Sequence, residues 1–185
     1  MQTDEGLVLR RFNLLVGCPR EREHAAKSEV QYFIGDLLDD PDLLIMAISG
    51  SGLLTCWTTL DPFQTTHELR KFAIENPYQF RFALRFTPIE RCVPSSLDEI
   101  VSAVVDLRDK IQDNESFRVT VRRRQSKLTS MDVVHKVAEV IHRRVDLKRP
   151  DKTVWVEIIG EISGISVLVR DDDILSVRTI ENGVP

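Results

Sequence analysis

The sequence predicts a mixed α/β protein made of two small domains. Both halves of the 185-residue chain alternate short apolar segments of strand type with longer segments in which apolar residues recur every three or four positions. The stretch 87–94 has little periodicity and is bracketed by Pro88 and Pro94, which is typical of a linker. We therefore expect one α+β domain over residues 1–94 and a second α/β domain over residues 95–185.

The first half has the element order βαββαβ. Strands are expected at 12–16, 43–48, 53–58 and 80–86, and helices at 20–38 and 62–74. Asp61 is placed to cap the second helix. The segment 49–52, Ser-Gly-Ser-Gly, could cradle a phosphate, but its place between two strands favours a hairpin turn. This order of elements is the ferredoxin-like arrangement.

The second half has the order αβαββ. A helix is expected over 97–112, capped by Ser95 or Ser96, followed by a strand at 116–123. Ser130 is placed to cap a third helix, which carries inward-facing apolar residues as far as Val145. Strands at 153–160 and 165–169 complete the unit, so helices again pack on a sheet.

Positive charge is concentrated in residues 118–152. This stretch holds eleven Lys and Arg against four Asp and Glu, a local charge of +7 in a chain whose net charge is −4. A phosphate-binding surface requires such a local excess of cations. A solvated helix or strand face is the alternative explanation of any charge run.

The cations fall at two places along the predicted elements. Residues 122–124, all Arg, stand at a strand end and are followed by Lys127 in a loop and by a helix start, where free N–H groups favour an anion. Arg143, Arg144, Lys148 and Arg149 follow the end of that helix, where cations offset the helix dipole. We therefore rank the strand-end arginines above the second group as RNA contacts.

Three segments in this half resemble the core of a THUMP domain. They are Phe117-Arg-Val-Thr-Val-Arg-Arg-Arg124, Val145-Asp-Leu-Lys-Arg-Pro-Asp151 and Thr153-Val-Trp-Val-Glu-Ile158, and the resemblance spans about residues 96–176. The ferredoxin-like first half resembles the usual companion of that domain. The resemblance implies an RNA-binding module of tRNA-modifying proteins, often directed to the tRNA acceptor end. The RNA-binding residues expected on these grounds are Arg118, Arg122, Arg123, Arg124, Lys127, Lys148, Arg149 and Lys152.

Catalytic and metal chemistry are not predicted. The sequence has no methyltransferase glycine motif, P-loop or zinc-deaminase signature, and no nucleophile, base and orienting group at a meaningful spacing. Its three cysteines form no Cys-x-x-Cys pair. His135 and His142 share a face of the predicted helix but lack a third ligand, and residues 171–173, all Asp, lack the pattern of a calcium loop. We expect no cofactor.

The chain is expected to act as a non-catalytic tRNA-binding adaptor. It resembles the stand-alone THUMP proteins that assist an RNA cytidine acetyltransferase in forming acetylcytidine in tRNA. One alternative is the RNA-binding subunit of a methyltransferase or of a thiouridine-forming system, and another is an interaction module that binds an acidic protein. Apolar runs are too short for a membrane span and residues 1–15 do not form a secretory signal, so a cytoplasmic location is expected.

Overall fold

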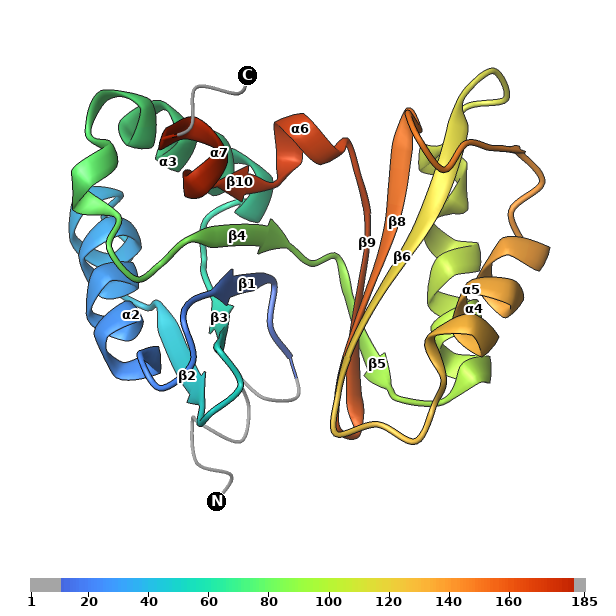
Figure 1. Cartoon of the computed structure of the whole chain (residues 1–185), viewed down its shortest axis with the longest axis horizontal. Helices are drawn as coiled ribbons and strands as arrows, with labels where there is room; N and C mark the ends of the chain where they lie inside the picture. The colour runs from blue at the N-terminus through green and yellow to red at the C-terminus, as the bar shows by residue number, and fades with distance from the viewer. Residues whose placement is uncertain (1–10, 182–185) are drawn as a thin grey trace. The chain divides into compact units, whose positions relative to one another are not determined.

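The computed structural model describes residues 11–181 and divides the chain into two compact units (Figure 1). The first unit comprises Met1–Pro88 together with Asp171–Pro185, and the second comprises Ile89–Arg170. Each unit contains a five-stranded sheet with helices packed against it. The predicted mixed fold of a ferredoxin-like unit followed by an α/β unit is confirmed.

The first unit has the predicted βαββαβ order. Its elements are β1 (Leu14–Gly17), α2 (Glu23–Val30) continued by the π-helix η1 (Gln31–Leu37), β2 (Leu44–Ile48), β3 (Leu53–Trp57), α3 (Pro62–Glu75), the 3₁₀ helix η2 (Pro77–Gln79) and β4 (Arg85–Pro88). The sheet order is β10-β4-β1-β3-β2, and every pair is antiparallel. The edge strand β10 (Leu175–Ser176) comes from the C-terminal segment. Apart from that added edge, the order is ferredoxin-like.

Local signals account for the hairpin and the second helix. The carboxylate of Asp61 accepts the N–H of Gln64 at 2.8 Å, so it caps α3 as predicted. The connector 49–52 is a hairpin turn between β2 and β3, also as predicted. Gly52 has φ of +69° and a Cβ there would lie 2.7 Å from the carbonyl oxygen of Cys18, so this position requires glycine. Its N–H donates to Glu23, so it is not open to a phosphate.

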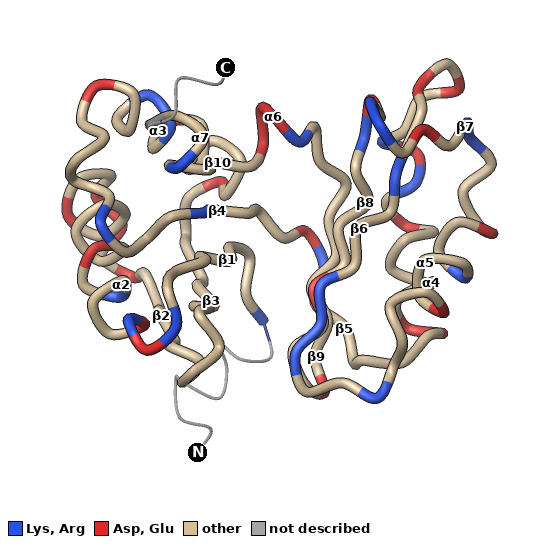
Figure 2. Tube along the Cα trace, viewed as in Figure 1, with Lys and Arg blue, Asp and Glu red and all other residues tan. Residues whose placement is uncertain are grey.

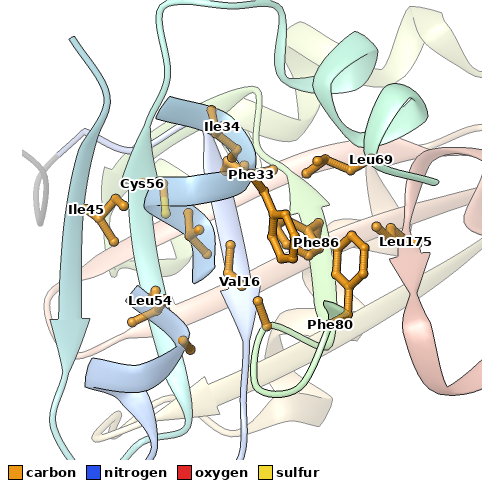
Figure 3. Close-up of a cluster of buried hydrophobic side chains, with 14 of the residues drawn as sticks. Val16, Phe33, Ile34, Ile45, Leu54, Cys56, Leu69, Phe80, Phe86 and Leu175 are labelled. Atoms are coloured by element: carbon orange, nitrogen blue, oxygen red, sulfur yellow. The ribbon is translucent and has the colours of Figure 1, made fainter. Parts of the chain in front are cut away.

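The predicted strand at 80–86 is wrong over residues 80–84, because β4 begins only at Arg85. The backbone N–H groups of residues 81–83 donate to the carboxylate of Glu29 at 2.8–3.1 Å instead of to a neighbouring strand. Phe80 still enters the core, where its ring stacks on Phe33 with the centroids 4.1 Å apart (Figure 3). Burial of an apolar residue therefore does not imply a strand.

The division of the chain differs from the expected boundary between residues 94 and 95. The predicted linker contains a strand, β5 (Arg91–Pro94), which pairs with β9 (Ile162–Leu168) in the second unit. Residues 171–181 group with the first unit, because β10 pairs with β4 and Arg70 donates to the carbonyl oxygens of Asp172 and Ile174 at 3.0 and 2.8 Å. The short helices α6 (Arg170–Asp173) and α7 (Val177–Glu181) flank β10.

The second unit places two helices on one face of a mixed sheet. Its remaining elements are α4 (Leu97–Leu107), the 3₁₀ helix η3 (Arg108–Lys110), β6 (Ser116–Arg124), α5 (Ser130–Glu139), β7 (Arg144–Val145), β8 (Lys152–Ile159) and β9 (Ile162–Leu168). The sheet order is β5-β9-β8-β6-β7, with β6 parallel to β7 and β8. The core lies between the helices and one face of the sheet, to which the strands contribute Phe117, Val154, Val156, Ile158, Ile165 and Val167.

The helix ends of the second unit correct two expectations. Ser96 caps α4 as predicted, but the hydroxyl that caps α5 belongs to Thr129 and not to Ser130. Helix α5 ends at Glu139, before His142 and Val145, so His135 and His142 do not share a helix and Val145 is exposed. Arg108 donates to the carbonyl oxygen of Val140 at 3.1 Å and satisfies one group that the helix end leaves open.

Across residues 11–181, no helix has the length and apolar character needed to cross a membrane.

Candidate nucleic-acid interface

The predicted RNA-binding residues lie at opposite ends of β6, where Figure 2 shows Lys and Arg. The strand-end cluster consists of Arg122, Arg123, Arg124 and Lys127. The turn cluster consists of Arg118, Lys148, Arg149 and Lys152, and Lys152 pairs in register with Phe117 at the start of β6. Arg118 and Arg122, the members nearest each other along β6, are four residues and about 13 Å apart, whereas Phe117 and Arg124 are seven residues and about 23 Å apart. One phosphate cannot reach from one end of the strand to the other.

The strand-end cluster projects from the last residues of β6 and the loop that follows. Arg122 and Arg123 are exposed on opposite faces of the strand, and Lys127 is exposed in the loop. The positive φ of Gln125 ends the strand. At the N-terminus of α5 the Thr129 hydroxyl accepts a backbone N–H, and the negative charge of Asp132 lies in the first turn. The helix end therefore attracts a phosphate less strongly than its position predicts.

A buried carboxylate anchors the strand-end cluster. Glu157 is 4% exposed, forms an ion pair with Arg124 and accepts the indole N–H of Trp155 at 3.1 Å. The guanidinium of Arg122 lies over the Trp155 ring, 5.9 Å from its centroid. Burial raises the pKa of Glu157, against the opposing attraction of Arg124 and the hydrogen bond from Trp155. The charge of Arg124 is therefore already engaged, whereas Arg122 and Arg123 face solvent.

The turn cluster is anchored through the backbone. The carboxylate of Asp146 accepts the N–H groups of Lys148 and Arg149, both at 2.9 Å, and these bonds lower the pKa of Asp146. Asp151 accepts the N–H and the hydroxyl of Ser116 at 2.7 and 2.8 Å, and its pKa is lowered for the same reason. Both aspartates belong to the segment 145–151 that resembles the THUMP pattern. Their bonds fix the turn and leave the side chains of Lys148 and Arg149 exposed.

The other two members of the turn cluster are partly engaged. Arg118 donates to the carbonyl oxygen of Leu147 at 3.2 Å, and Lys152 lies 3.9 Å from the carboxylate of Glu115. Arg143, predicted to offset a helix dipole, instead donates to the carbonyl oxygen of Ile111 at 3.0 Å and pairs with Asp113 at 2.8 Å. Its guanidinium thus ties the end of α5 to the segment after α4.

Two features of the site were not predicted from the sequence. They are the ion pair of Glu157 with Arg124 and the exposed side chain of Leu147 in the turn. Glu157 stood in the segment 153–158 that supported the resemblance, but its partner Arg124 lies on another strand, so only the parallel register of β6 and β8 brings them together. Leu147 is 70% exposed between Asp146 and Lys148. The order of an acidic, an apolar and a basic residue at Asp146, Leu147 and Lys148 is the sequence pattern that could have indicated this exposed apolar residue.

The fold and the clusters define a class of protein in which a ferredoxin-like unit accompanies an α/β domain with basic residues at the ends of its central strand. Residues 94–168 match the THUMP domain family. The chain therefore contains a THUMP domain, a class of domain that binds RNA in tRNA modification.

Solved structures share this fold over most of the chain. PH1313 from Pyrococcus horikoshii Ot3 is 19% identical with a TM-score of 0.66, and the match covers 90% of this chain and 55% of that one. TrmN from Thermus thermophilus is 20% identical with a TM-score of 0.60, covering 85% and 45%. A 4-thiouridine synthetase, solved with RNA and bound ATP, is 13% identical with a TM-score of 0.58, covering 90% and 42%. The chain thus spans about half the length of these structures.

A comparison with the sequences of curated proteins gave no match.

Proposed function

We propose that this protein is a tRNA-binding adaptor that presents tRNA to a modifying enzyme, with an RNA cytidine acetyltransferase as the favoured partner. The observation that carries the proposal is a THUMP domain whose central strand has exposed cations at both ends, each next to a carboxylate that is fixed by hydrogen bonds. Arg122, Arg123 and Lys127 contact phosphates at one end, and Lys148 and Arg149 do so at the other. The remaining three cations have a supporting role, because their side chains already interact with other groups of the protein. They are Arg118, Arg124 and Lys152.

The net charges of the two units support tRNA binding by the second unit. The second unit has 15 Lys and Arg against 13 Asp and Glu, a net charge of +2, whereas the first has 10 against 16, a net charge of −6. An acidic surface repels the phosphate backbone of RNA, so tRNA binds through the second unit. The adaptor acts in the cytoplasm and contributes no catalytic residue or cofactor of its own.

The second candidate is an RNA-binding subunit of another tRNA-modifying enzyme, a methyltransferase or a thiouridine-forming system. The fold shared with a 4-thiouridine synthetase supports a thiouridine-forming partner. In either case this chain supplies the tRNA-binding surface. The two candidates differ in the nucleoside that depends on the protein.

The tRNA-binding surface is tested by gel-shift titration of the full chain with tRNA over a range of salt concentrations. The variant is Arg122→Ala/Arg123→Ala/Lys127→Ala, which spares Arg124 because that residue pairs with Glu157. We expect weaker binding and a salt slope reduced by about 2 to 3, because each lost phosphate contact removes about 0.7 to 0.9. Lys71→Ala, an exposed cation of the first unit, is the matched control. Unchanged affinity in the triple variant would rule out this surface.

The partner is tested by mass spectrometry of tRNA nucleosides from cells with and without the protein. Loss of acetylcytidine alone supports the acetyltransferase. Loss of a methylated nucleoside or of thiouridine supports the second candidate. An unchanged set of nucleosides would contradict an adaptor role in either form.

A further inference from the structure

The first unit carries a long segment without positive charge. Between Lys27 and Arg70 the sequence has seven Asp and Glu and no Lys or Arg. The π-helix η1 lies in this segment and exposes Tyr32 by 45% and Leu37 by 42%. Large apolar side chains exposed together within a charged rim mark an interaction surface.

The winding of η1 brings these two side chains onto one side. In a π-helix the hydrogen bonds join residues five apart, so Tyr32 and Leu37 lie one above the other. In an α-helix the neighbours on one face are three and four apart, and these two residues would diverge. The exposed carboxylates of Asp36 and Asp39 precede and follow Leu37. The turn therefore pairs apolar contact area with negative charge.

A third exposed side chain lies close in sequence to the same core residues. Tyr78 is 90% exposed in η2, two residues before Phe80. The Phe80 ring stacks on Phe33, and the Tyr32 ring lies 5.5 Å from Phe33. Tyr32 therefore contacts a buried aromatic stack whose Phe33 and Phe80 rings are drawn in Figure 3, and the turn that carries Tyr78 leads into that stack. We define Tyr32, Leu37 and Tyr78 as the tyrosine surface.

We propose that the tyrosine surface binds a basic segment of a partner protein. An apolar side chain of that segment packs against the tyrosines and Leu37, and its Lys or Arg residues face Asp36 and Asp39. Tyrosine is enriched among the residues that dominate protein–protein binding, and complementary charge speeds and orients the encounter. RNA is the poorer occupant, because both carboxylates repel phosphates; the exposed Arg81 limits this repulsion only at the Phe80 edge.

The inference rests on the proposed function for the identity of the partner, which is then the tRNA-modifying enzyme. The first unit binds the enzyme while the second binds tRNA. The surface itself is inferred from exposure, winding and charge within the first unit. The two ideas can therefore fail separately.

The first test is photo-crosslinking of the full chain in its own cells. Tyr32→benzoylphenylalanine and Tyr78→benzoylphenylalanine are expected to crosslink the same protein through peptides rich in Lys and Arg. Met131→benzoylphenylalanine, an exposed position on α5, is the control and is expected not to give these peptides. Asp36→Lys/Asp39→Lys should lower the crosslink yield by about tenfold. Crosslinks to RNA, to acidic peptides or to no protein, or a yield unaffected by the charge reversal, would overturn the proposal.

The second test separates enzyme docking from tRNA binding. Tyr32→Ser/Tyr78→Ser should lower recovery of the crosslinked partner by about tenfold while leaving tRNA affinity and thermal stability unchanged. A parallel fall in tRNA affinity would assign the surface to RNA and overturn the proposal. If the partner is not a tRNA-modifying enzyme, the docking surface stands and the adaptor role fails.

Discussion

The two cation clusters of the THUMP domain carry similar charge but are built in different ways. The strand-end cluster is held through a side chain, because buried Glu157 pairs with Arg124 and positions Trp155 beneath Arg122. The turn cluster is held through the backbone, because Asp146 binds the N–H groups of Lys148 and Arg149. The side-chain anchor neutralises one cation of its own cluster, because Glu157 pairs with Arg124. A backbone anchor leaves the charged side chains of Lys148 and Arg149 exposed.

The anchors also respond to acid in opposite directions. Burial raises the pKa of Glu157, so the native protein holds a proton that the unfolded chain releases, and the free energy of unfolding falls as pH rises through that range. Backbone hydrogen bonds lower the pKa of Asp146 and of Asp151. Their contribution is complete above the ordinary pKa and is lost as pH falls through the lowered one.

The largest effect is expected from breaking the side-chain anchor. Glu157→Leu leaves Arg124 without its partner and should lower the free energy of unfolding by about 2 to 3 kcal/mol, below the cost for a fully buried pair because a third of the Arg124 side chain is exposed. Arg124→Leu/Glu157→Leu should recover to within about 1 kcal/mol of the parent. Urea unfolding, followed by Trp155 fluorescence in a Trp57→Phe background, measures both.

The control for that experiment lies on the neighbouring hairpin. Glu161 is exposed in the turn between β8 and β9, and Glu161→Leu should change the free energy of unfolding by less than about 0.5 kcal/mol. If Glu157→Leu is equally mild, then Glu157 does not anchor the cluster and the contrast between the two clusters disappears.

A second prediction asks whether one tRNA uses both clusters. Arg122→Ala/Arg123→Ala and Lys148→Ala/Arg149→Ala should each reduce the salt slope of binding by about 1.5, and the four-site variant should lose the sum. Addition is expected because a strand of RNA spans the length of β6, whereas one phosphate does not. A four-site variant that behaves like one of the two pairs would show that tRNA contacts a single cluster.

Elements with a strong period could be predicted from the sequence. The alternation of β6 and the capped start of α3 each combine a local pattern with a local stop signal. The strand predicted over 80–86 was wrong over 80–84, because the N–H groups of residues 81–83 donate to Glu29, some fifty residues away. Strand β10 was missed because two residues carry no periodicity. In both cases the structure depends on a contact between residues far apart in the sequence.

The candidate site shows the same limit. From the sequence we could identify the cations, their division into a strand-end group and a second group, and the segment 145–151. The sequence did not show that the parallel register places Glu157 beside Arg122 on the adjacent strand. Neither the pairing of Arg124 nor the buried state of Glu157 can be read from neighbouring residues, since both depend on contacts between β6 and β8.

The smallest predicted effect concerns acid and the backbone anchor. Asp146 binds the N–H groups of Lys148 and Arg149 most strongly when it is ionised, and its pKa lies below the ordinary value of 3.8. NMR titration of these two amide signals should therefore give a midpoint below pH 3.8. Asp146→Asn keeps a neutral acceptor in the turn and should abolish that transition, because an amide side chain does not titrate. A midpoint at or above pH 3.8 would mean that the turn is not held by the carboxylate, and the two clusters would then differ in position alone.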